Sequence, residues 1–142
     1  MPSVRRPLLA LFILLVQGVR AELPPAANRV VDFVRDVGPI FREHCLACHG
    51  EEKQKSDYRL DARDTALKGG EHGEAAIVVG KSAESPLIQF VGGLDADTLM
   101  PPKKSDKARL TAEQIGVLRA WIDQGAVWPE RRSAKTRVIG GA

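Results

Sequence analysis

Apolar residues recur at helical spacing in the last third of the chain. A helix is predicted between Thr111 and Gly125, because glycine is a natural end for a helix. Its start fits a capping box, in which Thr111 and Gln114 satisfy each other's backbone N–H groups. One apolar face is formed at i, i+3, i+6 and i+7 by Ile115, Leu118, Trp121 and Ile122.

Another short helix is predicted just before Cys45. Asp36 is its expected N-cap, and Pro39 falls in the first turn, where the missing N–H of proline costs nothing. The helix would bring Cys45 and Cys48 to a common site. Its apolar positions recur at helical spacing at Phe33, Val37, Ile40 and Phe41.

Two further helices are expected in the middle of the chain. One covers 61–67 and is stopped by Gly69 and Gly70. The other begins with Ser85 as its cap, followed by Pro86, runs to Val91 and is closed by two glycines. Residues 51–57 form a polar loop, and 77–80 is either a brief extended piece or a buried loop. With no useful strand alternation and no repeat, the chain is predicted to be all-α, with three to five short helices and long loops.

The N-terminus has the layout of a secretory signal peptide. Arg5 and Arg6 precede an unbroken apolar run, 8–16, and a cleavage site is expected after Ala21. The run is short for a membrane span, although a retained anchor stays open. Residues 1–21 are therefore assigned to export into the periplasm or an equivalent compartment, 22–32 to an extended lead-in, and 130–142 to a flexible polar tail.

Export changes how the charge is interpreted. The chain has 21 Lys and Arg against 18 Asp and Glu, but three of the arginines lie within residues 1–21. The remainder carries 18 of each sign and no net charge, so the basic excess belongs to the targeting segment. With seven aromatic residues, not interleaved with basic ones, a nucleic-acid partner is not expected. A membrane partner is expected only if the segment is retained.

The run 45–49, C-L-A-C-H, carries the most specific chemistry. This C-x-x-C-H spacing is typical of covalent haem attachment: both thiols can bond to the haem and the imidazole of His49 can bind its iron. A redox dithiol or disulfide formed by Cys45 and Cys48 is an alternative, as is half of a zinc site. The chain has no further cysteine, and no βαβ pattern surrounds the motif. The motif predicts one covalent haem c.

A second iron ligand is expected from Met100. It is the one methionine outside the N-terminal segment, and two prolines follow it and stiffen its loop. A thioether ligand raises the reduction potential of haem iron. His72, between glycines, is the alternative ligand. The alternative role for Met100 is that of a core residue that fills a gap in the packing. His44 is expected at the surface or beside the haem propionates.

Other residues are candidates around the haem. An acceptor for the His49 Nδ1–H is expected from a backbone carbonyl near Arg59 and Leu60. Arg59, Lys81 and Trp128 are candidates to pair with the propionates. A basic patch that could steer an acidic redox partner, or an ordinary solvated loop, is formed by Lys103, Lys104, Lys107 and Arg109.

Residues 33–129 resemble the planctomycete-type cytochrome c domain, a branch of the small class I cytochromes c. The resemblance implies a class I cytochrome c-like fold, one haem c linked to Cys45 and Cys48, and axial ligands His49 and Met100. Domains of this family often stand in much longer exported proteins, and a free carrier and a truncated relative both stay open. The resemblance is carried by 36–40, 45–50, 59–61, 67–70, 77–81, 99–102, 120–122, 125–126 and 128–129.

The expected function is single-electron transfer between redox proteins, without bond chemistry of its own. One alternative is a haem enzyme or small-ligand sensor with an open or His72-ligated distal site. Another is a haem-bearing docking module of a larger exported complex.

Overall fold

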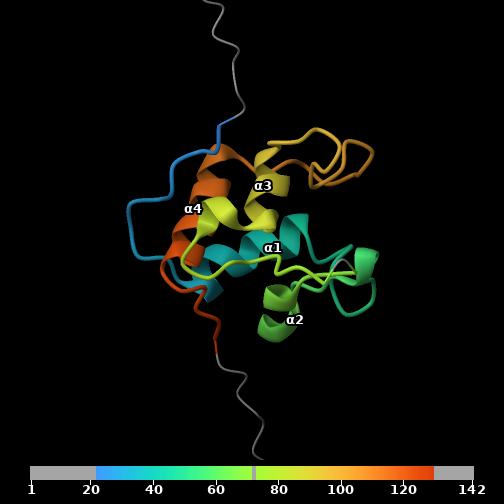
Figure 1. The fold of residues 1–142 in the computed structure, drawn as a ribbon, viewed down its shortest axis with the longest axis horizontal. Helices are drawn as coiled ribbons and strands as arrows, with labels where there is room; N and C mark the ends of the chain where they lie inside the picture. Colours follow the sequence, from blue (N-terminus) through green and yellow to red (C-terminus); the bar gives the residue numbers. More distant parts are fainter. Residues whose placement is uncertain (1–21, 72, 130–142) are drawn as a thin grey trace, which may run out of the picture.

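A computed structural model describes residues 22–71 and 73–129 (Figure 1). Its four α-helices are α1 (Gly38–His44), α2 (Arg63–Lys68), α3 (Pro86–Gly92) and α4 (Ala112–Asp123). The described residues contain no strand, only an isolated antiparallel bridge between His49 and Gln54. The all-α prediction is thus confirmed. No helix in the described ranges combines the length and apolar character needed to cross a bilayer.

The helix before Cys45 begins earlier than predicted. A π-helical turn, η1 (Phe33–Val37), leads directly into α1, and Asp32 caps it by accepting a hydrogen bond from the Arg35 N–H at 2.8 Å. The prediction that Asp36 is the N-cap is therefore wrong. Its carboxylate lies inside η1 and accepts from the Asp32 N–H at 2.8 Å, so it reaches back across the wider π turn. Pro39 does occupy the first turn of α1, as predicted.

Helix α3 begins and ends where the sequence predicts, but Ser85 does not cap it. Gly93 ends the helix with a positive φ of 66°, which glycine adopts without strain. Ser85 stands at the N-cap position, yet its side chain makes no capping hydrogen bond, contrary to expectation. Its hydroxyl instead accepts from the Val78 N–H at 2.9 Å and donates to the Lys81 carbonyl at 3.0 Å. The serine thus fixes the preceding buried loop, where Ile77 is 2% exposed.

Helix α4 forms as the pattern predicts, with both halves of the capping box present. Its Trp121 lies 5.8 Å from the ring of Phe41 on α1 and 5.3 Å from that of Trp128, which follows α4. Phe33 of η1 packs against all three, closest to Trp128 at 4.3 Å between ring centroids. These rings, with buried Leu118, form the core between α1 and α4.

The lead-in crosses the outer side of α4, where Figure 1 shows it as the blue segment. The Ala27 N–H donates to the carbonyl of Gly116 at 2.9 Å. A Cβ at Gly116 would lie 2.7 Å from the carbonyl oxygen of Pro25, so only glycine permits this approach. The lead-in therefore covers one face of the terminal helix.

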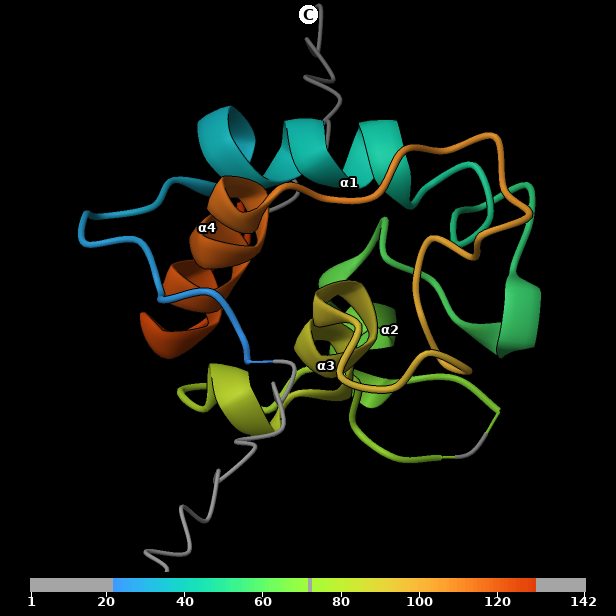
Figure 2. The same ribbon diagram turned by 90° about the horizontal axis from the view of Figure 1, so that it is seen from above.

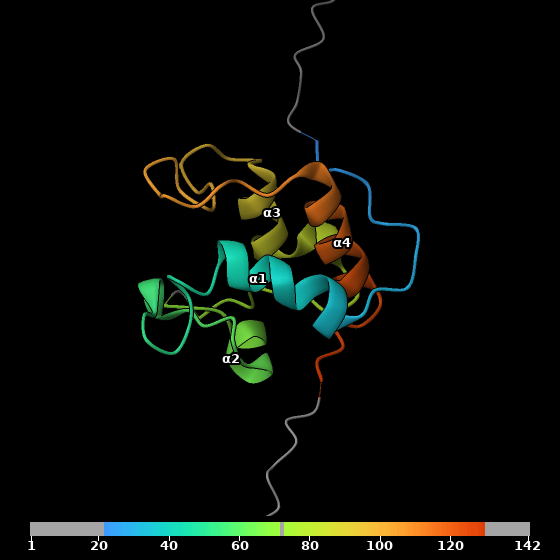
Figure 3. The same ribbon diagram turned by 180° about the vertical axis from the view of Figure 1, so that it is seen from behind.

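Helix α1 joins two differently built sides of the molecule. Seen from above, η1 at its N-terminal end lies over α4, and the C-terminal end of α1 reaches the irregular segments that follow α1 and α3 (Figure 2). The same two segments project together away from α4 in the view from behind (Figure 3). The residues with predicted chemistry lie on this loop side.

Candidate haem site

The chain turns sharply where α1 ends. The N–H groups of Cys48 and His49 both donate to the Cys45 carbonyl, at 3.0 and 2.9 Å. A Cβ at Gly50 would lie 2.6 Å from the Leu46 carbonyl oxygen, so the turn requires glycine there. The compact turn presents Cys45, Cys48 and His49 to one cavity.

That cavity has a volume of about 370 Å³. Met100 also lines it, so the structure brings together the two predicted attachment cysteines and the two predicted iron ligands. The Met100 N–H donates to the Phe90 carbonyl at 3.1 Å, which ties the methionine loop to the end of α3. The apolar part of the lining comes from Tyr58, Leu60, Ala76, Pro86, Leu87, Phe90, Val91, Pro101 and Pro102.

The imidazole of His49 is held with one nitrogen unsatisfied. Its Nδ1 is buried and has no hydrogen-bond partner. Burial lowers the pKa of His49, and the backbone of Tyr58 and Lys55 opposes this shift. The predicted acceptor near Arg59 and Leu60 is therefore not found. The backbone of Tyr58 and of Lys55 lies close enough to affect the ring. The ring of Tyr58 packs edge-on against it, with 5.5 Å between the ring centroids.

The two thiols are free, and Cys45 is buried. Burial raises the pKa of the Cys45 thiol to about 12. Redox-active cysteines need the opposite shift, because the thiolate is the reactive form. This environment therefore disfavours the alternative of a redox dithiol.

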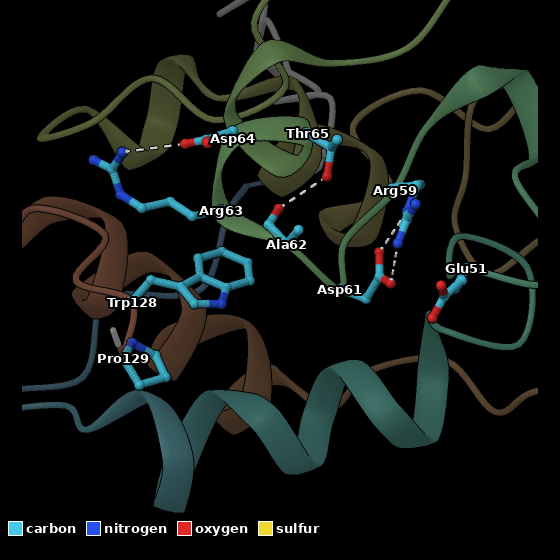
Figure 4. A pocket seen from close by; sticks show the side chains of 9 residues that line it. All are labelled: Glu51, Arg59, Asp61, Ala62, Arg63, Asp64, Thr65, Trp128 and Pro129. Atoms are coloured by element: carbon cyan, nitrogen blue, oxygen red, sulfur yellow. Dashed lines mark hydrogen bonds and ion pairs between the residues drawn. The ribbon is translucent and has the colours of Figure 1, made fainter. Parts of the chain in front are cut away.

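Three predicted propionate partners do not line this cavity. Arg59 forms a two-point ion pair with Asp61, at 2.8 and 2.6 Å, and Lys81 pairs with Glu84 at 3.1 Å. Arg59 and Trp128 line a separate open groove of about 900 Å³ (Figure 4). The groove is larger than the cavity, but no cysteine, histidine or methionine of the described residues lines it. Propionate pairing stays a prediction.

The two remaining histidines are His44 and His72. His72, the alternative ligand, lies outside the described residues. Of the two positions expected for His44, the surface is wrong, because the residue is 7% exposed and lines the cavity; a place beside the propionates stays a prediction. Its burial followed from no sequence signal, because its partners, Ala108 and Gln114, come from a distant segment.

The donor set of the cavity fits a covalently bound haem. Thiols suit thioether links, imidazole and thioether suit haem iron, and the apolar lining suits a porphyrin. The buried Nδ1 of His49 has no partner in the fold, whereas a metal-binding histidine commonly donates its second ring N–H to an acceptor, so the fit rests on the donor set and not on this nitrogen.

In a comparison with protein families, residues 45–104 match the family described as Planctomycete cytochrome C. This is the family that the sequence resembles, and the match begins at the first cysteine of the motif and includes Met100. Neither curated protein sequences nor solved structures gave a match to this chain.

Proposed function

Because residues 45–104 belong to the planctomycete cytochrome c family, we propose that this protein is an exported mono-haem c-type cytochrome that carries single electrons between redox proteins. One observation carries the proposal: Cys45, Cys48, His49 and Met100 line a single, largely apolar cavity. The cofactor supplies a one-electron iron couple, and the protein supplies attachment, ligation and a dry environment.

Each residue has a separate role. The sulfur atoms of Cys45 and Cys48 form thioether bonds to the haem. His49 is the proximal ligand and Met100 the distal one. The methionine loop is tied to α3 through the Met100 N–H, which restricts the sulfur to the cavity. With both axial positions filled, the site favours electron transfer over binding small molecules.

The proposed fold is of the class I cytochrome c type, spanning 33–129. Its support is the all-helical architecture of the described residues, in which Phe41 of α1 and Phe33 of η1 pack against Trp121 of α4. Residues 1–21 are the export signal and 130–142 the tail, and both lie outside the described residues. Export agrees with the chemistry, since attachment of haem c takes place outside the cytoplasm.

We further propose that the redox partner is acidic at its docking face. Lys103 and Lys104 are exposed and Lys107 lines the cavity. Glu74 and Asp97 line the same cavity, so the charge around it is mixed. The basic stretch steers an acidic partner only at low ionic strength, because salt screens exposed charges.

The test is purification of the protein after expression with haem-attachment machinery. We expect a pyridine haemochrome spectrum of haem c that acidified acetone does not extract. The oxidised protein should also show the far-red absorption band of a methionine–iron bond. A protein without a Soret band after correct maturation overturns the proposal. Haem c without the far-red band overturns only the assignment of Met100.

A further inference from the structure

His44 joins two segments that lie far apart in the sequence. It is the last residue of α1, and its side chain is 4% exposed. Its Nδ1 lies 2.8 Å from the carbonyl oxygen of Ala108, and its Nε2 lies 3.2 Å from the side-chain nitrogen of Gln114. The imidazole therefore bridges α1, the segment before α4 and the first turn of α4.

The hydrogen bonds of Gln114 determine which nitrogen of His44 carries the proton. The Gln114 amide oxygen accepts from the Thr111 N–H at 2.9 Å as part of the capping box. Its NH₂ group is therefore the end that faces His44, and an NH₂ group can only donate. His44 Nε2 must accept this bond, so Nδ1 carries the hydrogen and donates to Ala108.

The hydrogen bond from His44 to Ala108 links α1 to the segment 101–109. Residues 101–109 connect Met100 to α4 and have no regular secondary structure. Their other hydrogen bonds are local, from the Ser105 N–H to Pro102 and from the Lys107 N–H to the Ser105 hydroxyl. Among the described residues, His44 makes the one hydrogen bond that ties this segment to another part of the fold.

We propose that His44 is a positioning residue that holds the 101–109 segment closed over the distal side of the haem, and so keeps Met100 on the iron. Pro101, Ser105 and Lys107 of this segment line the cavity, and His44 lines it from the other side of the same bond. Losing the bond frees the segment to swing away from α1. The inference rests on the proposed His49 and Met100 ligation.

The experiment measures how fast added imidazole displaces Met100 in the oxidised protein. In His44→Leu, which has no donor, displacement should be roughly fivefold to tenfold faster, as expected for the loss of one buried hydrogen bond. His44→Asn places an amide N–H near the Nδ1 position and should give an intermediate rate. Glu43→Gln is the matched control: it is exposed, lies on the same turn, and its carboxylate is 3.6 Å from His44 Nε2.

The outcomes separate the inference from the proposed function. A wild-type rate in His44→Leu, with the far-red band present in the wild type, overturns the inference alone. An equal acceleration in Glu43→Gln also overturns it, because the charge pair would then hold the segment. Absence of the band in the wild type overturns the proposed ligation instead.

A second measurement applies if His44→Leu does not mature. Long-range proton–nitrogen spectra of the reduced wild-type protein report the tautomer of His44. We expect the hydrogen on Nδ1. A hydrogen on Nε2 would contradict the inference, since Nδ1 could not then donate to Ala108.

Discussion

The side of the molecule where α1 crosses α4 and the side that holds the cavity are packed in different ways. On the first side, Phe41, Leu118 and Trp121 are each no more than 1% exposed and contact one another or other rings. On the second side, irregular segments surround a cavity of about 370 Å³. The helical side is complete with its own side chains, and the loop side needs a group from outside the chain.

This difference shows which side is specified by local sequence signals and which depends on a bound group. Helical periodicity and caps specify α1 and α4 locally, and aromatic packing joins them. Residues 101–109 make few hydrogen bonds, so we expect them to gain order from what they surround. A group that binds only the folded chain stabilises it by mass action. The loop side should therefore depend on the haem more than the helical side does.

The largest effect is expected from replacing both cysteines, Cys45→Ala with Cys48→Ala. The haem is then not covalently held. A haem that is free to leave no longer stabilises the folded chain, and the segments around the cavity lose the contacts that it gives them. Thermal unfolding and amide hydrogen exchange should show a lower melting temperature and loss of protection at 94–109 before α4.

The single variant Cys48→Ala is the control for that experiment. It keeps one thioether link and should keep most of the protection. Equal loss of protection in α4 and in 94–109 in the double variant would remove the distinction between the two sides.

Replacing Trp121 with Ala tests the helical side. The indole is 1% exposed, and its Nε1–H donates to the Val127 carbonyl at 2.8 Å. The expected loss of unfolding free energy is about 3–5 kcal/mol, from the cavity left behind. Urea titration measures it. Val127→Ala is the control, since Val127 is 67% exposed and should change stability by less than about 0.5 kcal/mol.

Met100→Leu tests the loop side without emptying the cavity. The two side chains have similar volumes, so the cost in packing should stay below about 1.5 kcal/mol. The far-red band should disappear. The reduction potential should fall by on the order of 0.1 V, a small part of the roughly 0.8 V that axial ligands span. Potentiometric titration measures this, and an unchanged potential would mean that Met100 is a core residue.

The sequence correctly predicted those features that depend on residues close together in the chain. The capping box of α4, the glycine that ends α3 and the proline in the first turn of α1 all occur where expected. The cavity residues were also identified, because the spacing of Cys45, Cys48 and His49 has a chemical meaning on its own. The π turn was missed, since nothing in a short apolar pattern separates it from an α turn.

Long-range contacts were not predictable in the same way. His44 was expected at the surface or beside the haem propionates, because its place next to Cys45 keeps it from the opposite haem face. Its partners, Ala108 and Gln114, come from the other end of the domain. Arg59 was considered for the propionates, but Asp61, two residues later, pairs with it at the groove. Only the folded chain shows which of several possible partners lies within reach.

Thr111→Ala tests the predicted cap. The Thr111 side chain accepts from the Gln114 N–H at 3.2 Å, and losing this bond should cost about 1 kcal/mol. Thermal unfolding measures the change, and Thr111→Ser should restore most of it by keeping the hydroxyl. Because Gln114 also faces His44, Thr111→Ala should slightly speed displacement of Met100 by imidazole. A loss of stability equal in the serine variant would show that the methyl group matters and not the cap.

The smallest effect is expected at Asp36, whose role the pattern misjudged. Hydrogen bonds from Arg35, then Arg29, hold the pKa of this carboxyl well below its usual range. The folded state thus favours the carboxylate, and its contribution is complete above about pH 4 and lost as the pH falls through the folded pKa. Asp36→Asn should remove this acid-dependent loss and cost less than about 1 kcal/mol at pH 7, because both arginine partners are exposed and solvent screens the pairs. Urea titrations at pH 7 and at low pH measure both. An equal acid-dependent loss in the variant would assign the titration to other carboxyls, and a difference insensitive to salt would show that the pairs are not exposed.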